Sequence, residues 1–124
     1  MDRLFAKIPQ IGDLYYRRIY LFYDVPQIFS CVTKDGQDYF VIAIPAECDD
    51  DEAWLIVPMS PKRLLEAEGN EIEIRDILLH PESLVWRVEK SVENVSTVVV
   101  PPDTFEDEVL PECGEMLGVG YRLL

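Results

Sequence analysis

Two apolar, β-prone segments of this chain, residues 28–33 and 39–45, flank a short polar stretch that contains the pair Asp35-Gly36. Asp-Gly pairs favour the positive φ angles of tight hairpin turns. The spacing therefore predicts an antiparallel β-hairpin over these residues. This hairpin constrains the fold more than any other feature, because the next apolar segment, residues 53–59, extends it into an antiparallel meander of the type that buries one face.

Three further segments have the composition of strands. Residues 14–23 are aromatic and β-branched and end at a turn signal that contains Pro26, so they predict a strand, with a short helix as the alternative. Residues 85–88 and 97–100 predict two more strands. Pro58 indicates a strand end or an edge position, because proline lacks the N–H that a ladder needs.

Two short helices are expected between these strands. Ser60 followed by Pro61 is typical of a helix N-cap with proline at the first helical position, and this helix should end near Gly69. The apolar residues of the segment 74–79 recur at i, i+3 and i+4 and predict a second helix. The sequence thus predicts an α+β fold: a mostly antiparallel sheet of five or six strands with two short helices on one face.

A length of 124 residues is near the commonest domain size. We expect a single acidic α+β domain over residues 1–124, in which the segment from about residue 101 is irregular and rich in proline and acid. The charge is uneven: residues 1–46 hold five acids and five bases, for a net charge of zero, whereas residues 47–124 hold nineteen acids and six bases, for a net charge of −13. The negative charge therefore belongs to the later part of the chain.

Hydropathy predicts a cytoplasmic protein, and the cysteine spacing predicts free thiols. The longest apolar run, residues 39–46, is too short to cross a bilayer, so no membrane partner is expected. Cys31, Cys48 and Cys113 are odd in number and lack CxxC spacing. Free thiols are therefore expected in place of a disulfide framework or a zinc site.

The chain offers few groups for enzyme chemistry. His80 is the only histidine, and its place before Pro81 favours helix termination over a role as a general base. The acidic loop of residues 47–52 has carboxylates that suit calcium or magnesium, but it lacks the alternating ligands and central glycine of an EF-hand. We therefore predict no catalytic residue, no cofactor and no metal. A small metal-dependent enzyme with this loop as its ligands is an alternative.

An aromatic cluster lies within residues 15–23, with Arg17 and Arg18 in its middle. Aromatic rings and guanidinium groups both stack on nucleobases. A chain with a net charge of −13 would, however, lose the counterion release that drives most nucleic-acid affinity. Tyrosine and arginine are also enriched at hot spots of protein interfaces. The cluster therefore predicts core packing and protein binding, without nucleic-acid binding.

Five short segments carry a resemblance to a known family: LFYDVPQIFSC at residues 21–31, YFVI at 39–42, WLIVPMS at 54–60, IRD at 74–76 and LPE at 110–112. In these segments the chain resembles a family of small bacterial proteins that carry a domain of unknown function, over about residues 14–117. The resemblance implies no activity and no catalytic residue. It therefore supplies no site residues.

The expected function is non-enzymatic binding of a protein partner with a basic surface. Such a domain would act as an inhibitor, as an immunity or antitoxin-like protein, or as a DNA mimic. The alternatives are a structural subunit or homodimer of a larger bacterial assembly, or the metal-dependent enzyme. The residues expected to bind the partner are Tyr16, Arg17, Asp49, Asp50, Asp51, Glu52, Trp54 and Trp86.

Overall fold

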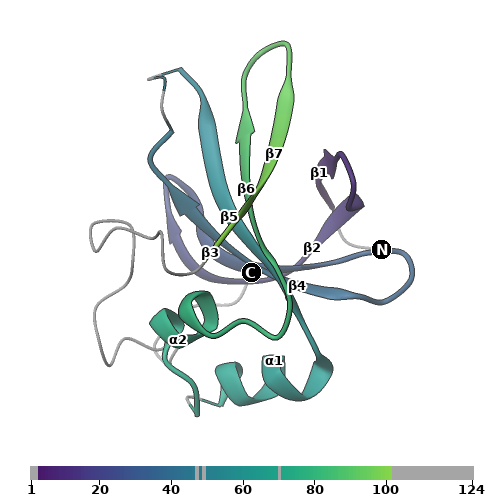
Figure 1. Cartoon of the computed structure of the whole chain (residues 1–124), viewed down its shortest axis with the longest axis vertical. Coiled ribbons are helices and arrows are strands. Elements are labelled where there is room, and N and C mark those ends of the chain that lie inside the picture. The colour runs from purple at the N-terminus through teal and green to yellow at the C-terminus, as the bar shows by residue number, and fades with distance from the viewer. Residues whose placement is uncertain (1–2, 47, 49, 70, 102–124) are drawn as a thin grey trace.

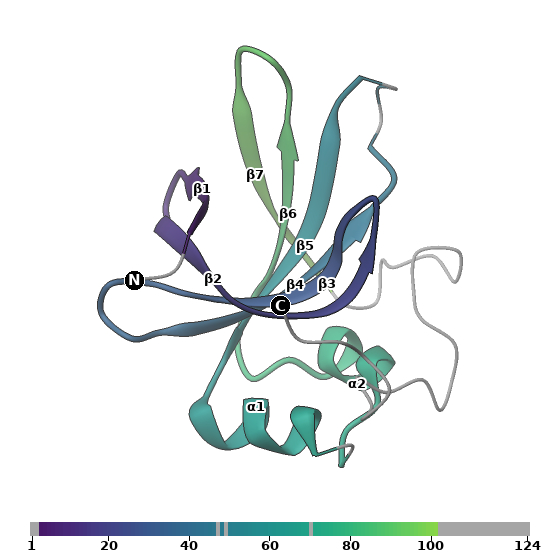
Figure 2. The same ribbon diagram turned by 180° about the vertical axis from the view of Figure 1, so that it is seen from behind.

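Figure 1 shows the computed structural model of the chain, which describes residues 3–46, 48, 50–69 and 71–101. Seven antiparallel strands follow one another across a single sheet in chain order. The sheet curls into a half-barrel, seen from opposite sides in Figures 1 and 2, and two short helices are inserted between the fifth and sixth strands. The elements are β1 (Leu4–Ile8), β2 (Gly12–Tyr23), β3 (Val25–Val32), β4 (Asp38–Ile44), β5 (Glu52–Met59), α1 (Pro61–Glu68), α2 (Ile74–Leu79), β6 (Val85–Lys90) and β7 (Val95–Val100).

The expected sheet of five or six strands is wrong, because residues 4–8 also form a strand, which makes seven. Strand β1 has the sequence LFAKI, which does not alternate apolar and polar side chains and so lacks the pattern of a half-buried strand. The proline and glycine within residues 9–12 are a turn signal that could have marked the end of this strand. In the structure, Gln10 and Gly12 take positive φ angles of 73° and 103° where the chain reverses. The α+β description fits only in part, since both helices belong to one insertion in a β half-barrel. The irregular segment expected from about residue 101 lies, apart from Pro101, outside the described residues.

The predicted hairpin of β3 and β4 is confirmed. Gly36 has a φ angle of 91°, which favours glycine at this turn position. The turn is closed by two backbone hydrogen bonds of 3.0 Å each, from Gly36 N–H to the Thr33 carbonyl and from Thr33 N–H to the Gln37 carbonyl. The Asp-Gly signal therefore located the turn correctly.

The reversal between β2 and β3 is tighter than predicted. Asp24 alone links the paired residues Tyr23 and Val25, with a φ angle of 62°. Pro26 consequently lies inside β3 and opposite Phe22, although it was assigned to the turn. Strand β3 begins at Val25 and not at residue 28.

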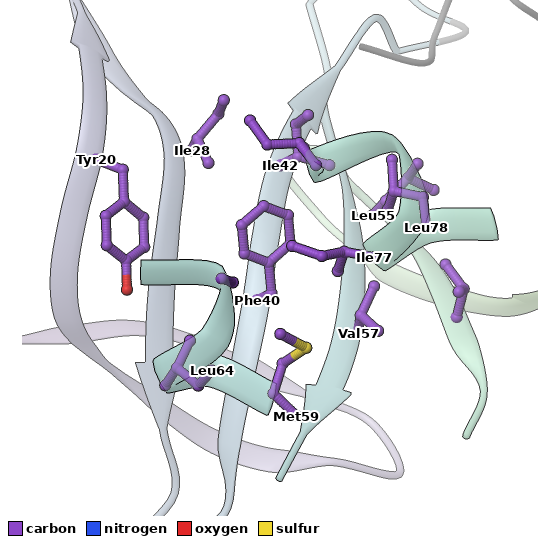
Figure 3. Packing of buried hydrophobic residues seen from close by; sticks show 13 residues of the cluster. Tyr20, Ile28, Phe40, Ile42, Leu55, Val57, Met59, Leu64, Ile77 and Leu78 are labelled. Carbon is purple, nitrogen blue, oxygen red and sulfur yellow. The ribbon is translucent and has the colours of Figure 1, made fainter. Parts of the chain in front are cut away.

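The curled sheet buries apolar side chains on both of its faces. Helices α1 and α2 cover one face, the helix face, where Figure 3 shows Phe40 beside Leu64 and Ile77. The other face is concave, and its cluster includes Phe29 and Trp54 together with residues of both edge strands, β1 and β7. Because both faces are covered, the middle strands are continuously apolar and do not alternate, as residues 53–57 of β5 illustrate.

Both helices begin and end where the sequence predicted. Ser60 Oγ caps α1 by accepting a hydrogen bond from Arg63 N–H at 3.2 Å, and Gly69 is the C-cap. Arg63 Nη2 also donates to the carbonyl oxygens of His80, at 2.7 Å, and Asp76, at 3.3 Å. The arginine therefore joins α1 to the last turn of α2 and adds a donor to carbonyls at its C-terminal end.

A buried polar contact holds α1 against the sheet. Tyr20 of β2 is only 3% exposed; its hydroxyl donates to Glu68 Oε2 at 2.5 Å and lies 3.1 Å from Ser30 Oγ. Burial, followed by the hydrogen bond to Glu68, raises the pKa of the Tyr20 phenol far above its ordinary value. The phenol therefore remains a neutral donor at any physiological pH.

A β-bulge places both arginines of β2 on the helix face. The register between β2 and β3 shifts between Tyr16 and Arg18, so successive side chains no longer alternate strictly. Arg17 Nη1 and Arg18 Nη1 both reach Glu68 Oε2, at 3.1 and 3.4 Å, and Arg17 Nε lies 3.8 Å from Asp38 Oδ1. Arg17, which was expected to bind a partner, is thus paired within the fold.

Replacing Tyr20 with phenylalanine should lower the free energy of unfolding by about 1–3 kcal/mol, because Glu68 loses a donor in a poorly solvated site. Urea denaturation followed by circular dichroism measures the change. The matched control is Tyr23→Phe, which removes a hydroxyl from a side chain that is 76% exposed. This control should change the free energy by less than about 0.5 kcal/mol. Equal losses in the two variants would contradict a special role for the Tyr20–Glu68 contact.

Candidate functional site

A pocket of about 370 Å³ opens on the concave face, between the β2–β3 hairpin and the connection from β4 to β5. Strands β1 to β5 and the β4–β5 connection contribute to its lining. Ala43 pairs with Trp54 across β4 and β5, and the small alanine side chain leaves space above it. The lining residues that matter for its chemistry are Phe5, Tyr16, Phe29, Asp51, Glu52 and Trp54.

Four aromatic rings form one wall of this pocket. The Phe5 ring lies edge-on to three others, with centroid distances of 5.4 Å to Tyr16, 4.9 Å to Phe29 and 5.1 Å to Trp54. Tyr16 and Phe29 are themselves 5.1 Å apart. Edge-to-face pairs at these distances are mutually favourable and hold the rings in fixed orientations. The wall is therefore rigid and presents aromatic surface to an occupant.

The guanidinium group of Arg3 lies over the ring of Tyr16. The Arg3 guanidinium carbon lies 5.2 Å from the ring centroid, within the range of cation–π attraction. Burial raises the pKa of the Tyr16 phenol, while the positive charge of Arg3 opposes the shift. The phenol is therefore neutral at physiological pH, and its ring face is suited to positively charged groups.

Carboxylates stand at the mouth of the pocket. Asp51 and Glu52 line it from the start of β5, and Asp50 is exposed in the same connection. Partial burial, a hydrogen bond with Glu89 and the negative charges of Glu89 and Asp50 raise the pKa of the Asp51 carboxyl above its ordinary value. Crowded carboxylates repel one another and so attract a cation. We call Asp50, Asp51 and Glu52 the acidic rim.

One residue of the rim and two residues beside it have the spacing of metal ligands. The ligand atoms of Cys48, Asp51 and Glu89 all lie within 4.8 Å of one another. A thiolate with two carboxylates suits a divalent transition metal such as zinc better than calcium. Glu89 Oε1 also accepts a hydrogen bond from Arg87 at 3.0 Å, so part of its charge is already neutralised. The set could hold a metal only in competition with that arginine.

The thiols of the described residues are free, as predicted. Cys31 is buried in the concave cluster, and burial raises the pKa of its thiol far above its ordinary value, which makes it unreactive. Cys48 is exposed beside the acidic rim. Cys113 lies outside the described residues.

Comparison with known proteins identifies the family. The sequence model of DUF6575, a family of unknown function, matches residues 2–119. The chain belongs to this family. The match confirms the resemblance to a family with a domain of unknown function. No curated protein and no solved structure matches the chain. In the described part of this DUF6575 chain, no helix is long and apolar enough to span a membrane.

The fold brings together four of the eight residues expected to bind a partner. Tyr16, Asp51, Glu52 and Trp54 line the pocket of this DUF6575 domain, with Trp54 as a buried wall and not a protruding anchor. Asp50 lies beside them. The other three are elsewhere or not described: Arg17 is on the helix face, Trp86 is half-buried in β6, and Asp49 lies outside the described residues.

Sequence reasoning missed three contributors to the site. Phe5 was missed together with its strand. Phe29 was placed in the predicted hairpin, but the face of the sheet on which it lies was not predicted. Glu89 was missed because only the pairing of β5 with β6 brings it to the acidic rim, through the register of Ala53 with Glu89. The charge pattern along one strand carries no signal for such a contact.

The β2–β3 hairpin adds an apolar surface next to the pocket. Phe22 and Val25 are each 51% exposed, and Tyr23 is 76% exposed. Val25 also lines the pocket, so the hairpin tip and the pocket are continuous. A cluster of large exposed apolar side chains commonly marks an interaction site.

Asp51→Asn should raise the melting temperature at pH 7. A carboxyl whose pKa is raised by folding stabilises the fold below its unfolded pKa of about 4 and loses that contribution as the pH rises through the folded value. The amide cannot ionise, so the gain should shrink as the pH falls below about 4.

Differential scanning fluorimetry across this pH range measures the effect. The control is Asp35→Asn, the same change in an exposed turn of the β3–β4 hairpin. If Asp51→Asn lowers the melting temperature at pH 7, the carboxylates of the rim do not repel one another as described.

Proposed function

We propose that this domain is a non-enzymatic protein-binding module, and that the acidic rim and aromatic pocket receive a cationic side chain of a partner with a basic surface. The observation that carries the proposal is the placing of Asp51 and Glu52 at the mouth of a pocket walled by four aromatic rings. Aromatic faces attract a cation, and carboxylates neutralise its charge and accept its hydrogen bonds. Arginine fits both features, because its guanidinium group stacks and forms paired hydrogen bonds.

The hairpin tip would supply the apolar part of the same interface. Interfaces combine a few large apolar or aromatic anchors with a polar rim, and the anchors provide most of the affinity. Phe22 and Tyr23 are exposed next to the pocket and fit the role of anchors. The net charge of −13 would speed the approach of a basic partner and disfavour nucleic acid.

Inhibitors, immunity or antitoxin-like proteins and DNA mimics share this combination of small size, negative charge and a defined binding face. We propose this class for the domain, acting in the cytoplasm. A homodimer is the weaker choice, because two copies with a charge of −13 repel each other at contact distance.

The proposal can be tested with a capped Gly-Arg-Gly peptide and its citrulline analogue, which has the same shape but no charge. In ¹⁵N-labelled protein, the arginine peptide should shift the indole N–H resonance of Trp54, which lines the pocket, and leave that of Trp86 unchanged. The citrulline peptide should shift neither resonance. Affinity for the arginine peptide should fall with rising salt, because the rim is exposed.

The variant for this test is Asp51→Asn combined with Glu52→Gln. Loss of charged hydrogen bonds should weaken binding of the arginine peptide roughly tenfold or more. The matched control, Asp35→Asn with Glu71→Gln, removes the same charge from two exposed sites away from the pocket. Equal affinity in the two double variants, or equal shifts with the citrulline peptide, would refute the proposal.

A small metal-dependent enzyme is the second candidate, favoured by the spacing of Cys48, Asp51 and Glu89. On the leading proposal, calorimetric titration with Mg²⁺, Ca²⁺, Mn²⁺ and Zn²⁺ should show no binding tighter than about 100 µM, a weak affinity by protein-metal standards. Tighter binding that is lost in both Cys48→Ser and Glu89→Gln would favour the second candidate instead.

A further inference from the structure

Strand β7 is an edge of the half-barrel, and β1, the other edge, approaches it without pairing with it. Within the described ranges it is hydrogen-bonded to β6 alone, and its sequence VSTVVV contains no charged residue. Val98 and Val99 are 59% and 41% exposed. The opposite edge, β1, carries Lys7 and an irregular register between Leu4 and Ala6, two devices that discourage further pairing. Among the described strands, β7 is therefore the edge most open to another strand.

The pairing of β6 with β7 determines which backbone groups of β7 point outward. Ser91 N–H donates to the Asn94 carbonyl at 2.8 Å, and the register continues without a bulge from Lys90–Val95 to Val85–Val100. Hydrogen-bonded and non-hydrogen-bonded pairs alternate along an antiparallel ladder. The N–H and C=O groups of Val95, Thr97 and Val99 consequently point away from β6. They form a ladder edge of three residues among the described part of the chain.

We propose that this edge binds an extended, basic segment of a protein partner as an additional strand. Such strand addition takes its affinity from main-chain hydrogen bonds and its specificity from alternate side chains. The side chains of Val99 and half-buried Trp86, which pair across the strands, offer an apolar contact on the concave face. Trp86, expected from the sequence to bind a partner, would take part here and not at the pocket.

Charge near β7 favours a basic occupant. The end of the sheet where β7 begins carries five acids, Asp50, Asp51, Glu52, Glu89 and Glu93, against two bases, Arg87 and Lys90. Figure 1 shows the β6–β7 turn and the start of β5 at this same end. A second copy of this chain would bring like charge to the same place, so it is disfavoured.

The probe is a capped peptide of alternating lysine and valine, seven residues long, added to ¹⁵N-labelled full-length protein. In an extended strand the lysine N–H groups point to one edge and the valine N–H groups to the other. In one control peptide the backbone nitrogen of every lysine carries a methyl group, and in the other the backbone nitrogen of every valine does. The charge is the same in all three peptides. Only one of these two edges can face β7.

Strand addition predicts two results. Hydrogen exchange of the Thr97 and Val99 amides should slow at least tenfold in the presence of the unmethylated peptide. One methylated peptide should bind at least tenfold more weakly than the other, and its identity gives the direction of the added strand. Equal affinity for all three peptides, or unchanged exchange of both amides, would overturn the proposal.

Substitution at Val99 gives a second test. Proline at an outward-facing edge position removes only the outward N–H, so Val99→Pro should keep the fold and bind the peptide more weakly than Val99→Ala, which also reduces the apolar contact but keeps that N–H. Circular dichroism checks that both variants are folded. If the Thr97 and Val99 amides are already protected without peptide, the edge is covered by the chain itself or, where protection rises with protein concentration, by a second copy. Either result overturns the proposal.

This inference takes only the positive charge of the partner from the proposed function. The two fail in different ways. Failure at the pocket appears as binding of the arginine peptide that is insensitive to Asp51→Asn with Glu52→Gln. Failure at β7 appears as Thr97 and Val99 amides whose exchange the lysine–valine peptide does not slow.

Discussion

The curl of the sheet is the constraint on which the rest of the structure depends. Three strands separate β1 from β5 in the sheet, yet Phe5 and Trp54 lie 5.1 Å apart because the sheet bends back on itself. Strand twist and the bulges in β1 and β2 favour this curvature. A flat sheet would leave the concave cluster in water, since both helices cover the opposite face. The curl therefore creates both the second core and the pocket, and it leaves β7 as an edge.

The bulge in β2 separates two kinds of chemistry that are adjacent in the sequence. Tyr16 faces the concave side, where it joins the aromatic wall, and Arg17 and Arg18 both face the helices. Glu68 binds both arginines and Tyr20, so these positive charges stabilise the attachment of α1 and do not reach the pocket. The acidic rim thus keeps its negative potential although the first 46 residues are neutral overall. One irregular residue in a strand decides where the charge of the N-terminal part acts.

Local signals predicted the local structure well. The β3–β4 turn depends on Gly36, and α1 depends on the cap formed by Ser60, so both were visible in a few adjacent residues. Features that depend on pairing between strands could not be read in this way. The position of Arg17 follows from a bulge, and the contact of Glu89 with Asp51 follows from the β5–β6 register. Four predicted residues nevertheless meet at the pocket, because the aromatic and acidic types that suit an interface are also the types that line it.

Net charge alone would not explain the arrangement of the carboxylates. Charge that serves only solubility is best spread out, because neighbouring carboxylates repel one another and destabilise the fold. Here burial raises the pKa of the Asp51 carboxyl, and the hydrogen bond with Glu89 and the negative charges of Glu89 and Asp50 raise it further, so repulsion contributes to the shift. A cation placed among them would remove the penalty, so the same crowding that weakens the free protein would strengthen a complex. Destabilised clusters of this kind are typical of binding sites, where stability and function compete. The crowding lies between the aromatic pocket and the start of β7, the two surfaces proposed for a partner, so a basic group bound at either surface would relieve it.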